Sequence, residues 1–154
     1  MPRYNYYFAA TAYHEAWGLM LSSGENDDGS CCYDAVTITN DAKEFYDTSP
    51  MPYGGGSSHC IAAIDANRLF TTGLDSFGDE DKSYLYYKDT GEWAPLPDMP
   101  TGRYEMGCGV VRDGNGQIEV VVVGGRVYPD YINTVEIFNI EEATWRTGKY
   151  FKYF

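Results

Sequence analysis

Residues 118–125 read IEVVVVGG, an apolar run interrupted only by Glu119 that ends in two glycines. A short run of this kind, rich in β-branched residues and bounded by glycine, is typical of a strand buried on both faces. The four residues 113–116 before it read DGNG, and Asn-Gly is a hairpin signal because both residues accept positive φ. The preceding segment 106–112 is therefore expected to be the strand that pairs with residues 118–123.

Two more strands are expected after the diglycine. Residues 134–138 read TVEIF and alternate in polarity, as a half-buried strand does. Residues 144–146 read TWR and begin a fourth strand, while 126–133 are expected to form a loop. The last third of the chain therefore reads as four short strands.

The same arrangement recurs upstream with a period near fifty residues. Met51-Pro52 returns as Met99-Pro100, 48 residues later. In each unit a glycine after the second strand precedes an aromatic residue of the fourth: Gly24 and Phe45, Gly73 and Trp93, Gly125 and Trp145. Another apolar residue lies seven positions before each aromatic: Ile38, Tyr86 and Phe138. We therefore divide the chain into units 1–50, 51–100 and 101–154, each of four strands.

This pattern resembles the Kelch repeat, in which a strand ending in diglycine is followed by an aromatic residue, six further residues and a tryptophan. The third unit matches fully, the second has one glycine, and the first lacks the tryptophan. The resemblance implies an all-β, propeller-type stack of three four-stranded Kelch-like blades, and a protein-binding function. It assigns structural roles to Gly24, Gly73, Gly124, Gly125, Phe45, Trp93 and Trp145.

Three blades are fewer than the four to eight with which propellers typically close. Such a stack leaves two apolar faces uncovered, and large apolar patches mark interfaces. Two explanations are open: the chain is part of a larger ring, which we favour, or two copies form a homodimer that closes six blades.

Composition excludes two classes of partner. With 23 acidic and 11 basic residues the net charge is -12, whereas binding to a phosphate backbone requires a basic face. No apolar run approaches the roughly 20 residues that a membrane-spanning helix needs. We expect no nucleic acid and no membrane as partners.

The acidic residues concentrate on one predicted face. Because strand direction alternates, the loops between second and third strands lie beside the connections between units, and these segments together carry most of the net charge. Aromatic residues among the carboxylates favour a protein or basic peptide as partner, although acidic loops also serve solubility alone. The candidate binding residues are Asp27, Asp28, Asp75, Phe77, Asp79, Glu80, Asp81, Arg126, Tyr128, Asp130 and Tyr131.

No catalytic, cofactor or metal site is expected. Kelch-like propellers include copper oxidases that use two histidines, two tyrosines and a Tyr–Cys crosslink, but His14 and His59 lie in different units. Cys60 and Cys108 are expected to be small buried thiols, while Cys31-Cys32 could be thiols, a disulfide or a redox pair. The alternatives to a recognition module are part of a propeller oxidase or lyase, or a purely structural assembly repeat.

The first residues, MPRYN, lack the basic segment and apolar run of a signal peptide. The default expectation is a cytoplasmic protein, or an extracellular one if the chain is part of a longer secreted protein.

Overall fold

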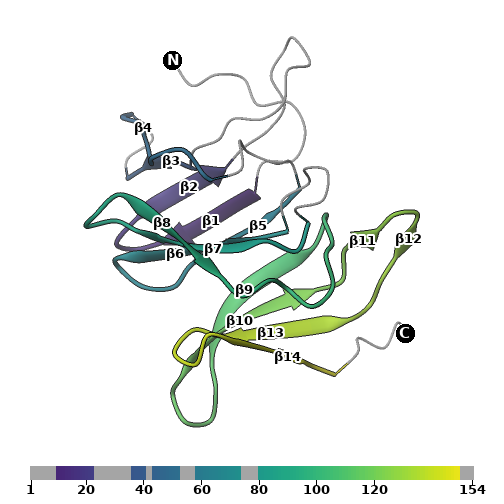
Figure 1. The fold of residues 1–154 in the computed structure, drawn as a ribbon. Coiled ribbons are helices and arrows are strands. Elements are labelled where there is room, and N and C mark those ends of the chain that lie inside the picture. The colour runs from purple at the N-terminus through teal and green to yellow at the C-terminus, as the bar shows by residue number, and fades with distance from the viewer. Residues whose placement is uncertain (1–9, 23–35, 41–42, 53–57, 74–79, 150–154) are drawn as a thin grey trace.

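The structure is a computed structural model, and it describes residues 10–22, 36–40, 43–52, 58–73 and 80–149. These residues form strands, turns and loops, and none of them lies in a helix that could cross a membrane. The strands make three four-stranded antiparallel sheets and one two-stranded hairpin (Figure 1). The predicted all-β fold with three four-stranded sheets is confirmed.

Each sheet follows the chain from its first strand to its fourth. Sheet 1 contains β1 (Ala10–His14), β2 (Gly18–Ser22), β3 (Val36–Thr39) and β4 (Tyr46–Asp47). Sheet 2 contains β5 (Cys60–Ala63), β6 (Arg68–Thr72), β7 (Ser83–Tyr87) and β8 (Glu92–Leu96). Sheet 3 contains β9 (Gly107–Arg112), β10 (Ile118–Val123), β13 (Val135–Asn139) and β14 (Thr144–Thr147). The hairpin of β11 (Arg126–Val127) and β12 (Asp130–Tyr131) lies in the connection from β10 to β13.

Sheet 2 is packed between the other two. The first strands β1, β5 and β9 contact one another in that order, so the sheets stack face to face. Leu69 on β6 belongs to an apolar cluster with Met20 of sheet 1, while its neighbour Phe70 belongs to a second cluster with Val120 of sheet 3. Because successive side chains of a strand point to opposite faces, both faces of sheet 2 are buried.

A tryptophan of the fourth strand completes each junction between sheets. Trp93 packs on Tyr86, and Trp145 packs on Phe138, with ring centroids 5.0 Å apart in both pairs. Each indole N–H donates to a carbonyl of the connection before its own sheet, at 3.0 Å for Trp93 to Ser49 and 2.9 Å for Trp145 to Pro97. The repeated ring therefore joins three elements: its own sheet, the preceding sheet and the connection between them.

The first unit departs from the predicted spacing by one residue. In sheets 2 and 3 the aromatic of the third strand pairs with the tryptophan, Tyr86 with Trp93 and Phe138 with Trp145. In sheet 1 Ile38 pairs with Tyr46, so continuing this register places Thr39, not Ile38, opposite Phe45. The predicted equivalence of Ile38 with Tyr86 and Phe138 is wrong, because a shift of one residue along a strand moves the side chain to the other face.

The prediction that Cys60 and Cys108 are isolated thiols is also wrong. They form a disulfide between β5 and β9, with a Cα–Cα distance of 5.9 Å. The tryptophan register makes Cys108 equivalent to Ile61 rather than to Cys60. This offset of one residue directs Cys60 toward sheet 3 and Cys108 toward sheet 2, where their sulfurs meet. Cys31 and Cys32 lie outside the described residues.

We expect the variant Cys60→Ala/Cys108→Ala to be less stable than the parent. The two cysteines are 48 residues apart, and a crosslink over a loop of that length restricts the unfolded chain by about 4 kcal/mol in the loop-entropy estimate. Urea unfolding under oxidising conditions measures the difference. Val127→Ala, at a 38% exposed position outside β5 and β9, is the control and should keep the parent's midpoint. Equal midpoints for the parent and the Cys60→Ala/Cys108→Ala variant would contradict the bridge.

Candidate functional site

The β11–β12 hairpin projects from sheet 3 beside the connection that leads from sheet 2 (Figure 1). Its base is fixed by two backbone hydrogen bonds between Tyr104 and Arg126, with N–O distances of 3.2 and 2.8 Å. A third bond runs from the N–H of Ile132 to the carbonyl of Gly125, at 3.0 Å. The segment expected to be an irregular loop is therefore an anchored hairpin.

Arg126 lies under the aromatic side chains of this hairpin. Its guanidinium carbon is 5.2 Å from the ring centroid of Tyr128 and 5.4 Å from that of Tyr131. A third ring, that of Tyr104, lies at 6.0 Å. Cation–π contacts of this length hold ring and guanidinium together by roughly 0.5–1 kcal/mol at exposed positions. We call Arg126, Tyr128, Asp130 and Tyr131 the tyrosine hairpin.

The outer surfaces of both rings are accessible. Tyr128 is 76% and Tyr131 is 73% exposed, and Asp130 between them is exposed as well. Large exposed aromatics on a fixed backbone are suited to binding, because they bury much area while losing little side-chain entropy. The hairpin presents two such rings and a carboxylate.

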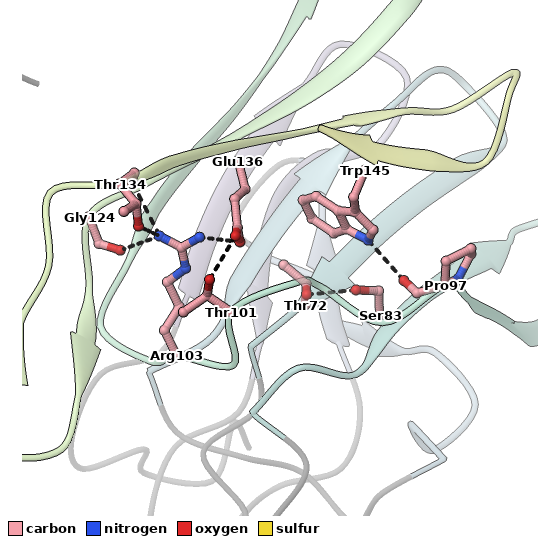
Figure 2. A network of polar contacts seen from close by, with 9 residues as sticks. All are labelled: Thr72, Ser83, Pro97, Thr101, Arg103, Gly124, Thr134, Glu136 and Trp145. Atoms are coloured by element: carbon pink, nitrogen blue, oxygen red, sulfur yellow. Dashed lines mark hydrogen bonds and ion pairs between the residues drawn. The ribbon is translucent and has the colours of Figure 1, made fainter. Parts of the chain in front are cut away.

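A buried ion pair supports the base of the hairpin (Figure 2). Arg103 is fully buried and donates to Glu136, which is also buried, and Thr101 donates to the other carboxylate oxygen of Glu136 at 2.8 Å. The second guanidinium nitrogen of Arg103 donates to the carbonyls of Gly124 at 3.1 Å and Thr134 at 3.2 Å. The two carbonyls lie at the ends of β10 and β13, so Arg103 fixes the points where the hairpin segment leaves and rejoins sheet 3.

The glycines predicted to be structural make room for the same connection. At Gly125 φ is +98°, and a Cβ there would lie 2.8 Å from the carbonyl oxygen of Tyr104. At Gly73 φ is +75°, and a Cβ would lie 2.7 Å from the carbonyl oxygen of Arg103. A residue other than glycine at either position would have a strained backbone conformation, and its Cβ would also collide with a backbone oxygen.

Glu80 and Asp81 contact the other side of this connection. The carbonyl of Glu80 accepts from the N–H of Arg103 at 3.1 Å, and that of Asp81 accepts from Met99 at 2.7 Å. Lys82 donates to Asp98 at 2.6 Å and lies 3.5 Å from a carboxylate oxygen of Asp81. The hydrogen bond to Asp98 raises the pKa of Lys82, so this cation stays charged and offsets part of the acidic charge.

Six of the predicted binding residues thus lie in two segments, 80–81 and 126–131, that hydrogen-bond to residues 99–104. Glu80 and Asp81 contribute mainly through their backbone, whereas Arg126, Tyr128, Asp130 and Tyr131 contribute side chains. The other predicted residues lie outside the described part of the chain: Gly24, Asp27, Asp28, Asp75, Phe77 and Asp79.

Two buried features were not found in the sequence. Trp17 is fully buried and donates from its indole N–H to the carbonyl of Asp65 at 2.6 Å, joining sheets 1 and 2. His59 is hydrogen-bonded through Nε2 to Ser22, and both side chains are buried. The repeat offered no signal for either, because Trp17 and His59 have no counterpart of the same type in the other units. Among the described residues no three His, Cys, Asp or Glu side chains are grouped as metal ligands.

Comparison with known proteins agrees with this architecture. The Kelch motif family matches residues 119–151, which lie in the third unit. Among the solved structures, 142 chains match, including the structure of YjhT, a Kelch-type propeller protein. YjhT has a TM-score of 0.72 and 14% identity over the whole of this chain. No curated protein matches the sequence.

The third unit therefore carries a Kelch motif, and the three described sheets have the fold of propeller blades. The predicted resemblance is confirmed in sequence for the third unit and in fold for the described structure. The chain corresponds to 55% of the length of YjhT, so it spans about half of that protein. At 14% identity this likeness establishes the fold alone.

We expect Arg103→Leu to destabilise the protein by about 3–5 kcal/mol, because Glu136 would remain buried without its partner. Urea unfolding measures the change. Lys82→Ala is the control: it removes a partly exposed ion pair, for which a loss below about 1 kcal/mol is expected. Equal losses for the two variants would contradict a structural role for the buried pair. If Arg103→Leu does not fold, Glu136→Gln provides the milder test.

Proposed function

We propose that the chain is a non-catalytic recognition module that binds a basic segment of another protein at the tyrosine hairpin. The observation that carries this proposal is the exposure of Tyr128 and Tyr131 at 76% and 73% on a hairpin held by Arg126. Exposed aromatics of this kind act as binding anchors in protein interfaces. Arg126 and the buried pair of Arg103 and Glu136 hold these two tyrosines in position in the absence of a partner.

The charge of the chain supports a basic partner. Its net charge is -12, and Asp130 lies between the two tyrosines. The long-range field of such a surface attracts cations and speeds their association. In this proposal Asp130 pairs with a lysine or arginine of the partner, and the tyrosine rings cover the apolar stem of that side chain.

The non-catalytic part of the proposal rests on the sequence. The two histidines lie in different units, and His59 is buried against Ser22. Stoichiometric copper or iron in purified protein, measured by elemental analysis, would contradict it and favour the alternative of a propeller oxidase.

Of the two compartments that the sequence left open, we favour the extracellular one. The Cys60–Cys108 disulfide supports this choice, because disulfides persist in oxidising compartments and are rare in the cytosol.

A synthetic lysine- and arginine-rich peptide provides the probe. We expect it to bind the parent protein, and we expect Tyr128→Ala/Tyr131→Ala to weaken binding about tenfold, which corresponds to about 1.4 kcal/mol for two lost anchors. Fluorescence anisotropy of labelled peptide measures the affinity. Tyr46→Ala, which removes a 44% exposed tyrosine from β4, is the matched control and should bind as the parent does.

Charge reversal tests the same site independently. Asp130→Lys should weaken peptide binding, whereas Asp89→Lys should not. Asp89 is an exposed carboxylate in the turn between β7 and β8, and in these antiparallel sheets that turn lies at the strand ends opposite to those that carry the hairpin. Both variants change the net charge equally, so a general charge effect would weaken both alike. Equal affinities for all four proteins and the parent would refute the tyrosine hairpin as the binding site.

A further inference from the structure

The first strands of sheets 2 and 3 each follow a residue in the left-handed backbone conformation. The φ angle is +64° at Ser58, two residues before β5, and +58° at Glu105, two residues before β9. The tryptophan register that makes Cys108 equivalent to Ile61 also makes Glu105 equivalent to Ser58. The N–H of Glu105 donates to the carbonyl of Ser58 at 2.8 Å, so this conformation is part of the junction between the two sheets.

A glutamate is an unfavourable residue for this position. In the left-handed conformation the Cβ of an L-residue crowds the following carbonyl oxygen, whereas glycine adopts the conformation without strain. The bond to Ser58 uses only the backbone N–H of Glu105, which a glycine would supply equally well. Strained residues of this kind are concentrated at functional sites. The reason for a glutamate here is therefore to be sought in its side chain.

The carboxylate of Glu105 is accessible to a partner. The residue is exposed, and within the described part of the chain its carboxylate has no hydrogen-bond or ion-pair partner. The residues on both sides of it are fixed: Tyr104 by its two backbone hydrogen bonds to Arg126, and Met106 by burial. The backbone that carries this carboxylate is thus held in place beside the tyrosine hairpin.

Glu105 and Asp130 lie on opposite sides of Arg126. Arg126 pairs with Tyr104 on one side and with Tyr131 on the other, so residues 104–105, β11 and β12 form three adjacent rows. Neighbouring rows of a sheet are about 4.8 Å apart, which separates the two outer rows by roughly 10 Å. Two residues four positions apart in an extended peptide lie on the same face and are roughly 13 Å apart, a similar distance.

We propose that Glu105 is a second anionic contact of the binding site and that it selects partners with two separated basic side chains. The inference rests on the proposed function and deepens it. One basic side chain of the partner pairs with Asp130 between the tyrosine rings, and the other pairs with Glu105. The guanidinium of Arg126 lies between the two carboxylates and repels a cation placed there, so adjacent basic residues fit the site less well.

Two synthetic peptides of identical composition test the spacing. Both have blocked termini and two lysines in an otherwise uncharged sequence, with the lysines four positions apart in one peptide and adjacent in the other. The parent protein should bind the peptide with separated lysines about threefold more tightly, the contribution of one exposed ion pair. Glu105→Gln should abolish this preference. Fluorescence anisotropy of the labelled peptides measures both affinities.

The matched control changes a glutamate far from the hairpin. Glu142→Gln makes the same substitution at an exposed position in the turn between β13 and β14, at the strand ends opposite to those that carry the hairpin. This variant should keep the preference for separated lysines. A parent protein that binds the two peptides with equal affinity would overturn the inference, as would a preference that survives in Glu105→Gln.

A glycine substitution separates recognition from folding. Glu105→Gly should keep or raise the urea midpoint, because glycine removes the backbone strain, and it should lose the preference for separated lysines. Ala143→Gly is the control, since it relieves a φ of +51° in the β13–β14 turn and should keep that preference. A lower midpoint for Glu105→Gly would show that the side chain supports the fold and would also overturn the inference.

Failure of this inference and failure of the proposed function give different results. If Glu105→Gln binds both peptides as the parent does while Tyr128→Ala/Tyr131→Ala binds them more weakly, Glu105 is not a contact and the tyrosine hairpin still binds the partner. If Tyr128→Ala/Tyr131→Ala binds both peptides as the parent does, the proposed function is refuted and the role of Glu105 is refuted with it.

Discussion

The contact of Phe70 with Phe138 and Trp145 is the interaction on which the rest of the described structure depends. The ring centroid of Phe70 lies 5.6 Å from that of Phe138 and 6.2 Å from that of Trp145, across the junction of sheets 2 and 3. A single four-stranded sheet cannot bury both faces, so its stability comes from such junctions. Trp145 also bonds to the carbonyl of Pro97, and the packing of the sheets thereby fixes the connection between them.

The candidate site follows from the position of that connection. Residues 99–106 pass close to Gly73 and Gly125, where a side chain would collide with backbone atoms. Arg103 then reaches the carbonyls at the ends of β10 and β13 and fixes the base of the tyrosine hairpin. The buried pair of Arg103 and Glu136 acts on the hairpin through position alone, since neither side chain is exposed.

The period and the strands could be predicted because they depend on local patterns: the apolar run before Gly124, the Asn-Gly turn and the spaced aromatics. The face of the sheet to which each side chain points could not be predicted, because a shift of one residue in strand register reverses it. Phe45 is opposite Thr39 rather than Ile38, and Cys60 is one position away from equivalence with Cys108. The disulfide exists because of that offset, and sequence spacing alone treats the two cysteines as equivalent. The clustering of Arg126 with three tyrosines also required the structure, because Tyr104 reaches it from another segment.

The contacts of each side chain determine whether its position tolerates substitution. Phe70, Phe138 and Trp145 contact two sheets at once, so a change of size at any of them disturbs both. Tyr128 and Tyr131 contact Arg126 on one side and solvent on the other. Their replacement removes little buried area, so the fold tolerates different side chains there. The side chains that the hairpin exposes can therefore change while the junctions that position the hairpin stay the same.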